Sequence, residues 1–270
     1  MSSDALCSDA QLREITMYTA LRFAIVFAIV FYSSAFGQEW RPLFDGQSLD
    51  GWVTQDRQPV DATSWEVRDG MLHLDHLKGD GGNLLTDQDY GDFELSFEWK
   101  VAPKANNGIK YRVQDFDGRT LGLEYQVIDD AGLPQLKPNH KTASIYDIYD
   151  VKEHSLLKPA GEFNRGRIVV NHNRIEHWLN GQLVAEAEVG SDQWQQRIAD
   201  SKFSDVDGFG LNHFGRIMIT DHHDEVWYRN IFIRDLSPRF QAVAASTSHG
   251  CCCPQETARR GLFRRMARRR

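Results

Sequence analysis

Strict alternation of apolar and polar residues constrains this chain more than any other feature of its sequence. Over residues 93–101, FELSFEWKV, five apolar side chains alternate with four polar ones. Successive side chains of a strand point to opposite faces, so this pattern predicts one buried and one solvent-facing surface. Such half-buried strands are typical of antiparallel sheets that cover a hydrophobic core. The sequence therefore favours an all-β fold.

Turn residues divide the alternating segments at regular intervals. The dipeptides Asp69-Gly70 and Asn180-Gly181 each separate two short alternating runs, which predicts two tight hairpins. Further strands are expected in GIKYRV, LGLEYQVI, RGRIVVNH, GRIMIT and VWYRNIFIRDL. A single helix is predicted over residues 192–201, with Ser191 as its N-cap. This spacing predicts a β-sandwich with one short helix.

The two ends of the chain differ from the middle in composition and charge. We expect an N-terminal extension over 1–38, one β-sandwich domain over 39–238 and a tail over 239–270. The whole chain has a formal charge of −7, but ten of its 31 basic and only four of its 38 acidic residues lie in the two end segments, so the middle carries about −13. An acidic body of this kind excludes nucleic acid as a partner, because phosphate binding needs a basic face.

The N-terminal segment predicts export. From Met17 a short basic stretch leads into the apolar run 23–32, and small residues at Ala35 and Gly37 mark a cleavage site before Gln38. A signal peptide over Met17–Gly37 implies a periplasmic or extracellular protein. The apolar run is shorter than the ~20 residues that span a bilayer, so the mature protein is expected to lack an integral membrane segment. An uncleaved membrane anchor is the alternative.

Cysteines occur only near the two ends of the chain, at Cys7 and in the run Cys251–Cys253. The predicted domain therefore contains no disulfide. The arginine-rich tail 239–270 lacks strand or helix periodicity and is expected to be disordered. It is a solvated appendage or an attachment to an anionic surface.

Eight segments, in order over about residues 40–236, resemble the 3-keto-disaccharide hydrolase domain family. The resemblance implies a concanavalin A-like jelly roll of two antiparallel sheets, one of them concave, and hydrolase or lyase action on 3-keto-glycosides. The family commonly has a QDHG-like string where this chain has residues 220–223, TDHH, so Asp221 and His222 match it and Thr220 and His223 depart from it. The segments are PLFDGQSLDGW, WEVRDGMLHL, LLTDQDYGDFELSFEWKV, NNGIKYRV, GLEYQVIDD, TASIYDIY, HWLNGQLV and ITDHHDEVWYRNIFIRDL.

Chemistry on a 3-keto-glycoside makes specific demands on a site. The ketone acidifies the hydrogen on C2, so a base can remove that proton and expel the group on C1, after which water adds to the enone. Such a site needs a base, a stabiliser for the enolate oxygen and an acid for the leaving group. A bound divalent cation could provide the enolate stabilisation, but the sequence contains no metal-ligand pattern that identifies a site.

Strand parity nominates residues for these roles. Glu124 and Gln126 share one face of their strand, and Lys110 and Arg112 share one face of another. We expect these four side chains to converge on an open sheet face, with Glu124 as a catalytic residue and the other three as substrate-binding residues. The alternative is that Glu124 only forms an exposed ion pair with Arg112, which would contribute little stability.

Residues at strand ends and in loops complete the prediction. His222 is the second expected catalytic residue, because an imidazole exchanges protons near neutral pH; it could instead cap a turn. Asp221, beside it, is expected to contact substrate. His140, in a polar loop with two prolines, and the pair Tyr146 and Asp147 are also predicted to bind the sugar.

We therefore predict an exported hydrolase or lyase that acts on a carbohydrate substrate. A non-catalytic, lectin-like carbohydrate-binding module is the alternative, because one fold can serve both activities. A surface protein attached through its basic tail is a third reading. The sequence leaves the aglycone, the linkage and the oligomeric state open.

Overall fold

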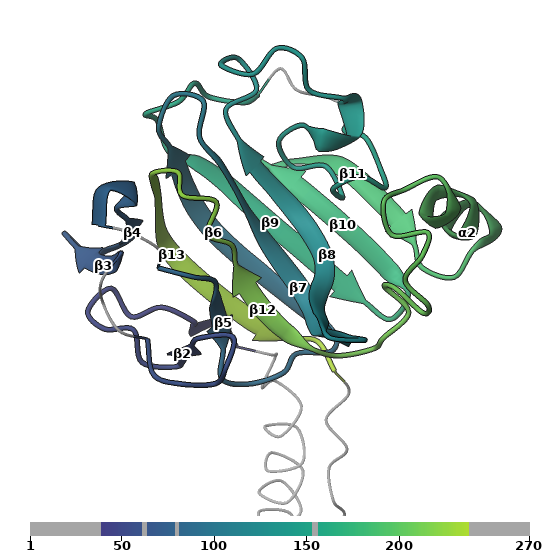
Figure 1. Ribbon diagram of the computed structural model, residues 1–270, viewed down its shortest axis with the longest axis horizontal. Coiled ribbons are helices and arrows are strands. Elements are labelled where there is room, and N and C mark those ends of the chain that lie inside the picture. The colour runs from purple at the N-terminus through teal and green to yellow at the C-terminus, as the bar shows by residue number, and fades with distance from the viewer. Residues whose placement is uncertain (1–38, 61–63, 79–80, 153–155, 238–270) are drawn as a thin grey trace, which may run out of the picture. The chain divides into compact units, whose positions relative to one another are not determined.

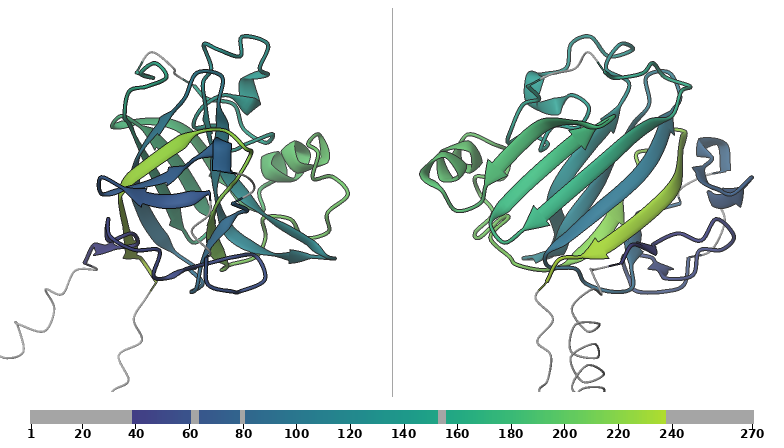
Figure 2. Two further views of the ribbon diagram at one scale, coloured as in Figure 1. Left: turned by 60° about the vertical axis from the view of Figure 1, so that its left-hand side comes forward. Right: turned by 180° about the vertical axis from the view of Figure 1, so that it is seen from behind.

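Two antiparallel β-sheets pack face to face in the described part of the chain (Figures 1 and 2). The computed structural model describes residues 39–60, 64–78, 81–152 and 156–237, which belong to one compact unit. The described residues contain one α-helix beside the strands. The predicted all-β, jelly-roll-like sandwich of two antiparallel sheets is confirmed.

The larger sheet has the strand order β11-β10-β9-β6-β13-β4-β3, with β1 paired to β13. The smaller sheet has the order β2-β5-β12-β7-β8. The strands of the larger sheet are β1 (Arg41–Pro42), β3 (Trp65–Arg68), β4 (Met71–Leu74), β6 (Phe93–Val101), β9 (Asn164–Asn171), β10 (Arg174–Leu179), β11 (Gln182–Glu188) and β13 (Val226–Asp235). Those of the smaller sheet are β2 (Trp52–Val53), β5 (Leu84–Thr86), β7 (Asn106–Phe116), β8 (Arg119–Ile128) and β12 (Arg216–Ile219).

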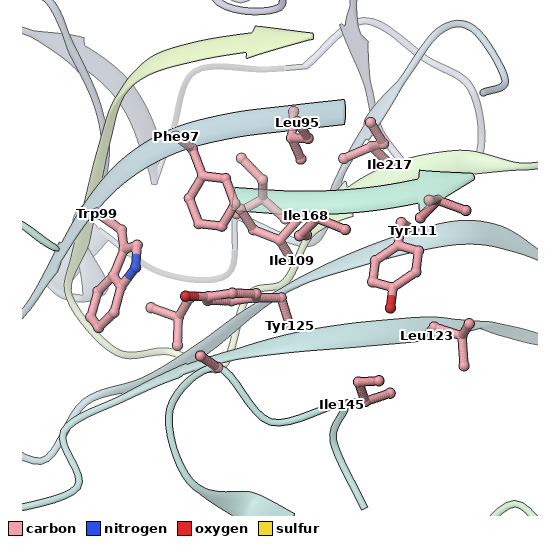
Figure 3. Packing of buried hydrophobic residues seen from close by; sticks show 14 of the residues in the cluster. Leu95, Phe97, Trp99, Ile109, Tyr111, Leu123, Tyr125, Ile145, Ile168 and Ile217 are labelled. Atoms are coloured by element: carbon pink, nitrogen blue, oxygen red, sulfur yellow. The ribbon is translucent and has the colours of Figure 1, made fainter. Parts of the chain in front are cut away.

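The hydrophobic core lies between the two sheets and is built from the apolar sets predicted by alternation. Phe97 of β6 meets Tyr125 of β8 edge to face, with ring centroids 5.2 Å apart, and Leu95 and Ile109 are fully buried beside them (Figure 3). Gly166 of β9 lies opposite Phe97, where a Cβ atom would come within 2.3 Å of the ring. Because these residues point inward, their polar neighbours along each strand point outward. The sandwich therefore has two independent outer faces.

Both predicted hairpins form as the turn residues require. Asp69 and Gly70 have φ angles of 52° and 73° between β3 and β4, and Asn180 and Gly181 have φ angles of 49° and 90° between β10 and β11. Positive φ at both central residues matches the twist of the flanking strands. The hairpins set the register of both strand pairs.

The helix α2 spans Asp192–Ala199, two residues shorter than predicted. Ser191 caps it, because its hydroxyl accepts a hydrogen bond from the backbone N–H of Trp194 at 3.1 Å. Trp194 is buried, and its ring is stacked with that of Tyr149, with centroids 6.2 Å apart. The turn that follows α2 leads back toward the outer face of the smaller sheet, as the contact of Lys202 with Tyr146 shows.

Several predictions concern residues that the structure does not describe. The signal segment Met17–Gly37 and the tail 239–270, with the run Cys251–Cys253, lie outside the described residues. Within the described part, no helix has the length and apolar character needed to cross a membrane.

Candidate functional site

A buried carboxylate on the outer face of the smaller sheet is the centre of the candidate site. Glu124 lies in the middle of β8, and its neighbours Leu123 and Tyr125 fill the core, so its own side chain points outward. The register pairs Glu124 with Lys110 of β7, whose ammonium lies 3.9 Å from the carboxylate. Glu124 is nevertheless only 6% exposed. The predicted shared face of Glu124, Gln126 and Lys110 is thus present.

Gly108 makes room for this carboxylate. It precedes Lys110 by two residues on β7 and therefore presents the same outer face. A Cβ atom at position 108 would lie 2.1 Å from Oε1 of Glu124, which is far closer than any real contact. The absence of a side chain at Gly108 lets the Glu124 carboxylate occupy the space over this part of β7.

Residues 143–147 extend the smaller sheet beyond β8. The N–H of Ala143 donates to the carbonyl of Gln126 at 2.8 Å, and the N–H of Tyr146 donates to the carbonyl of Glu124 at 3.0 Å. This pairing brings Tyr146 beside Glu124. Burial raises the pKa of the Tyr146 phenol, and the nearby Glu124 carboxylate raises it further. Tyr146 therefore stays protonated and can donate a hydrogen bond.

Asp147 connects its own segment to the 3₁₀ turn that contains His140 and to the turn that contains Lys202. Its Oδ1 atom lies 2.7 Å from Nε2 of His140, and its Oδ2 atom accepts a hydrogen bond from the backbone N–H of Lys202 at 2.7 Å. Its own N–H donates to the carbonyl of Asn139, and its φ angle is 62°. The sequence predicts substrate contact for Asp147, but both carboxylate oxygens already have protein partners. These contacts tie Asp147 to the 3₁₀ turn and to the turn after α2, and its contact with substrate stays a prediction.

Lys202 is the site residue that the sequence analysis misses. Its ammonium lies 4.2 Å from the centroid of the Tyr146 ring, and its charge acts on Glu124. Burial lowers the pKa of Lys202, an effect that Glu124 opposes. Lys202 belongs to an irregular turn after α2, where no periodic pattern marks a side chain as functional. Only the folding of this distant turn onto β8 reveals it.

Burial and charge compete at Glu124. Burial raises the pKa of its carboxyl group, and the ammonium groups of Lys110 and Lys202 partly offset that increase. The result is a carboxyl group with a raised pKa that is still paired with cations. A carboxylate with an elevated pKa is a stronger base than a solvated one.

His222 lies at the exposed rim of the site, in the segment that joins β12 to β13. Partial burial lowers the pKa of its imidazole, and the charge of Lys110 lowers it further, while Asp221 and Asp224 act in the opposite direction. His222 is therefore neutral at physiological pH and can accept a proton. The backbone N–H of Thr220, two residues before His222, donates to the carbonyl of Gly108 at 3.0 Å, so this segment begins beside the part of β7 that faces Glu124.

Asp221 anchors the segment that carries His222. Its Oδ2 atom accepts hydrogen bonds from the backbone N–H groups of Gly81 and Gly82 at 3.0 and 2.9 Å. Its Oδ1 atom accepts from the N–H of His223 at 2.8 Å. The sequence predicts a substrate contact for Asp221, but its side chain is 3% exposed and satisfied by backbone groups. The carboxylate instead holds the loop.

Gln126 and His140 both follow Glu124 in the chain and lie close to it in the fold. Gln126 is 3% exposed and donates through Nε2 to Oδ1 of Asn106 at 3.0 Å. His140 lies in the 3₁₀ turn Pro138–His140, and its ring is tilted by 31° against that of Tyr146, with centroids 4.7 Å apart. The structure thus places Glu124 beside Lys110, Gln126 and Tyr146, with His140 against Tyr146, and the predicted catalytic and binding roles of these residues stay predictions.

The prediction that Arg112 shares the outer face of β7 with Lys110 is wrong. A bulge interrupts the pairing of β7 with β8 between Tyr111 and Gln114, and Arg112 has a φ angle of 50°. The bulge breaks the alternation, so Arg112 does not share the face of Lys110. Its guanidinium is 2% exposed and contacts the carboxylate of Asp92 at 3.3 Å and the carbonyl of His172 at 3.1 Å.

The donor set of this site is not typical of a metal centre. Among the described residues, no group of three or more His, Cys, Asp or Glu side chains is arranged to hold a metal ion. The ammonium group of Lys110 lies 3.9 Å from the Glu124 carboxylate, and the charge of Lys202 also acts on it. Positive charge for a developing anion is therefore available from the chain itself.

Comparison with known proteins identifies relatives of the whole described domain. Residues 39–234 match the model of a family described as the 3-keto-alpha-glucoside-1,2-lyase-like domain. A 3-keto-disaccharide hydrolase of Bacteroides thetaiotaomicron is 33% identical over 228 residues, covering 72% of this chain and 77% of the relative.

Two solved structures from Parabacteroides distasonis, both provisionally assigned as glycosyl hydrolases, share the fold. The first is 27% identical with a TM-score of 0.66 and covers 73% of this chain and 94% of the other. The second is 25% identical with a TM-score of 0.58 and covers 73% of this chain and 100% of the other.

The raised pKa of Glu124 predicts how Glu124→Gln changes stability with pH. Between the unfolded pKa of ~4.3 and the higher folded value, the folded chain binds more protons than the unfolded chain, so the stability of the unmodified protein falls as pH rises through this window. The glutamine variant lacks this loss. We therefore expect the free energy of unfolding of Glu124→Gln, relative to that of the unmodified protein, to increase from pH 4 to pH 8. Urea denaturation at a series of pH values measures this difference. A difference that is constant or shrinks over this range would contradict the assignment.

Proposed function

The chain belongs to the 3-keto-alpha-glucoside-1,2-lyase-like domain family, and from this premise we propose that it cleaves 3-keto-glycosides by removing the proton on C2. The predicted family is confirmed, and the chain is a carbohydrate-active hydrolase. The observation that carries the proposal is the buried carboxylate of Glu124 on an outer sheet face, 3.9 Å from the ammonium group of Lys110 and subject to the charge of Lys202.

The reaction we propose conserves atoms and needs no redox partner. A base takes the C2 proton, the C2–H electron pair forms the enolate of the 3-ketone, and the C1–O bond then breaks to release the alcohol. Water adds across the resulting C1=C2 bond, placing oxygen on C1 and hydrogen on C2. The sum of the two steps is hydrolysis, and interruption after the first step gives a lyase.

Glu124 is the proposed base. Its carboxylate is shielded from water, and burial raises its pKa, which increases its affinity for the C2 proton. Gly108 leaves the space above the strand that a carboxylate at this position needs. Such a base is held by a sheet and does not depend on a loop for its position.

Lys110 and Lys202 are proposed to stabilise the enolate oxygen that forms at C3. Both act electrostatically on Glu124, so a ketone oxygen near this carboxylate would also lie near positive charge. Charge placed beforehand where an anion develops is an effective form of transition-state stabilisation. A divalent cation is the alternative source of that charge, and chelation with EDTA during the assay distinguishes the two.

His222 is proposed to exchange the proton of the leaving group. Its imidazole is at the solvent-exposed rim and has a lowered pKa, so it is neutral and can shuttle a proton between solvent and sugar. Tyr146, with its ring beside Lys202, is proposed to hydrogen-bond or stack on the sugar ring. Gln126 and His140 are proposed to contact sugar hydroxyls.

Replacing Glu124 with glutamine tests the proposed base. We expect Glu124→Gln to lower kcat on a 3-keto-disaccharide by about 10²- to 10⁴-fold, because the amide cannot take up the C2 proton. The assay follows both monosaccharide and enone, with and without EDTA. Glu98→Gln is the matched control, because Glu98 lies on the larger sheet and is paired with Arg229.

An unchanged rate for Glu124→Gln would remove this residue from the mechanism. Substrate binding by the unmodified protein without release of monosaccharide or enone would instead identify a non-catalytic carbohydrate-binding module.

Export through the segment Met17–Gly37 is also proposed. The support is the sequence pattern of a basic stretch, an apolar run and small residues before Gln38. N-terminal sequencing of the protein recovered from the periplasm or medium is expected to begin near Gln38. An intact N-terminus on a protein that stays in the cytoplasm would rule the proposal out.

A further inference from the structure

A hollow lies on the outer face of the larger sheet, on the side of the core opposite to Glu124. It has a volume of about 520 Å³, and we call it the outer groove. Glu94 and Ser96 of β6 line it and alternate with the core residues Leu95 and Phe97. Because Leu95 and Phe97 point into the core, Glu94 and Ser96 point to the outer face of the larger sheet, away from the sheet that carries Glu124.

Aromatic rings form the walls of the outer groove. Trp178 of β10, Trp40 before β1 and Phe232 of β13 all line it. Trp40 is 41% exposed and Phe232 is 39% exposed. Large rings open to solvent on a sheet face are a feature of surfaces that bind something. Flat apolar rings framed by polar groups suit the faces of pyranose rings, which are apolar above and below and polar at their edges.

Guanidinium groups outnumber carboxylates along the floor. Glu94 is 5% exposed and forms ion pairs with both Arg167, at 3.1 Å, and Arg234. The Arg167 guanidinium lies 4.0 Å from the centre of the Trp178 ring, and Arg234 lies 4.9 Å from that of Trp40. These contacts form a row of side chains across four strands in which two cations share one anion.

The surplus of positive charge in the outer groove favours a ligand that carries negative charge. Arg165 also lines the groove, and Nε of Arg234 is buried without a hydrogen-bond partner among the described residues. Guanidinium groups bind carboxylates through paired hydrogen bonds. The body of the protein is otherwise acidic, so a cationic surface here stands out from its surroundings.

We propose that the outer groove binds a glycan that carries carboxylate groups, with the sugar rings against the aromatic walls and the carboxylates on the arginine side chains. The volume fits one or two sugar rings of a longer chain. Because the groove and Glu124 lie on opposite outer faces, one molecule can hold an acidic polysaccharide on one side and cleave a small 3-keto-glycoside on the other.

Calorimetric titration of the full chain tests this proposal. Three acidic probes, oligogalacturonate, oligomannuronate and hyaluronan fragments, are compared with neutral maltotetraose at low and high salt. At least one acidic probe is expected to bind, to bind more weakly at high salt, and to exceed the neutral probe in affinity. Glu124→Gln is expected to leave this binding unchanged, which separates the groove from the proposed catalytic site.

Variants locate the binding. Trp178→Ala, Phe232→Ser and Arg165→Ala are each expected to weaken binding about tenfold or more. Arg165→Ala and Phe232→Ser are the variants expected to disturb folding least, because both side chains are exposed. Arg174→Ala, on β10 but outside the groove, is the matched control.

The proposal is overturned if none of the acidic probes binds, if maltotetraose binds equally well, or if the three groove variants bind like the unmodified protein. A dimer in sedimentation analysis that Phe232→Ser dissociates would also overturn it, because the groove would then be an interface between two copies of the chain.

Discussion

The cost of burying one carboxylate governs the arrangement of the outer face of the smaller sheet. Glu124 is removed from water, and a buried carboxylate must neutralise or find cations nearby. The chain meets this demand with Lys110 on the next strand and Lys202 on a distant turn. Neither ammonium cancels the effect of burial completely, since the pKa of Glu124 remains raised. The site thus holds its base in a state of elevated proton affinity.

Much of the surrounding structure maintains this balance. Gly108 leaves the volume for the carboxylate, and residues 143–147 pair with β8 so that Tyr146 lies next to Glu124 along the sheet. Asp147 ties this segment to the backbone of Lys202, while Asp221 ties the His222 loop to Gly81 and Gly82. Each of these carboxylates is satisfied by protein groups. They hold the segments around the site in place, whereas Glu124 is the carboxylate proposed to act as the base.

Strand periodicity was sufficient to predict the sandwich, both hairpins and the shared face of Glu124, Gln126 and Lys110, because these features depend on local alternation and turn chemistry. It failed at Arg112, where a one-residue irregularity in β7 reverses the direction of the side chain. It also missed Lys202, because the approach of a turn to a strand 78 positions earlier depends on tertiary packing. Sequence alone likewise gives no sign that the carboxylates of Asp147 and Asp221 already have backbone partners.

Removal of the C2 proton is the central claim, and isotope incorporation tests it most directly. When a 3-keto-disaccharide is cleaved in D₂O, the account predicts that the released 3-keto sugar carries deuterium on C2, because the original proton is lost to Glu124 and a solvent deuteron replaces it. Mass spectrometry and NMR of the product, recorded before solvent exchange of the free ketone, give the result. A product that keeps its original hydrogen on C2 would show direct displacement at C1 and contradict the mechanism.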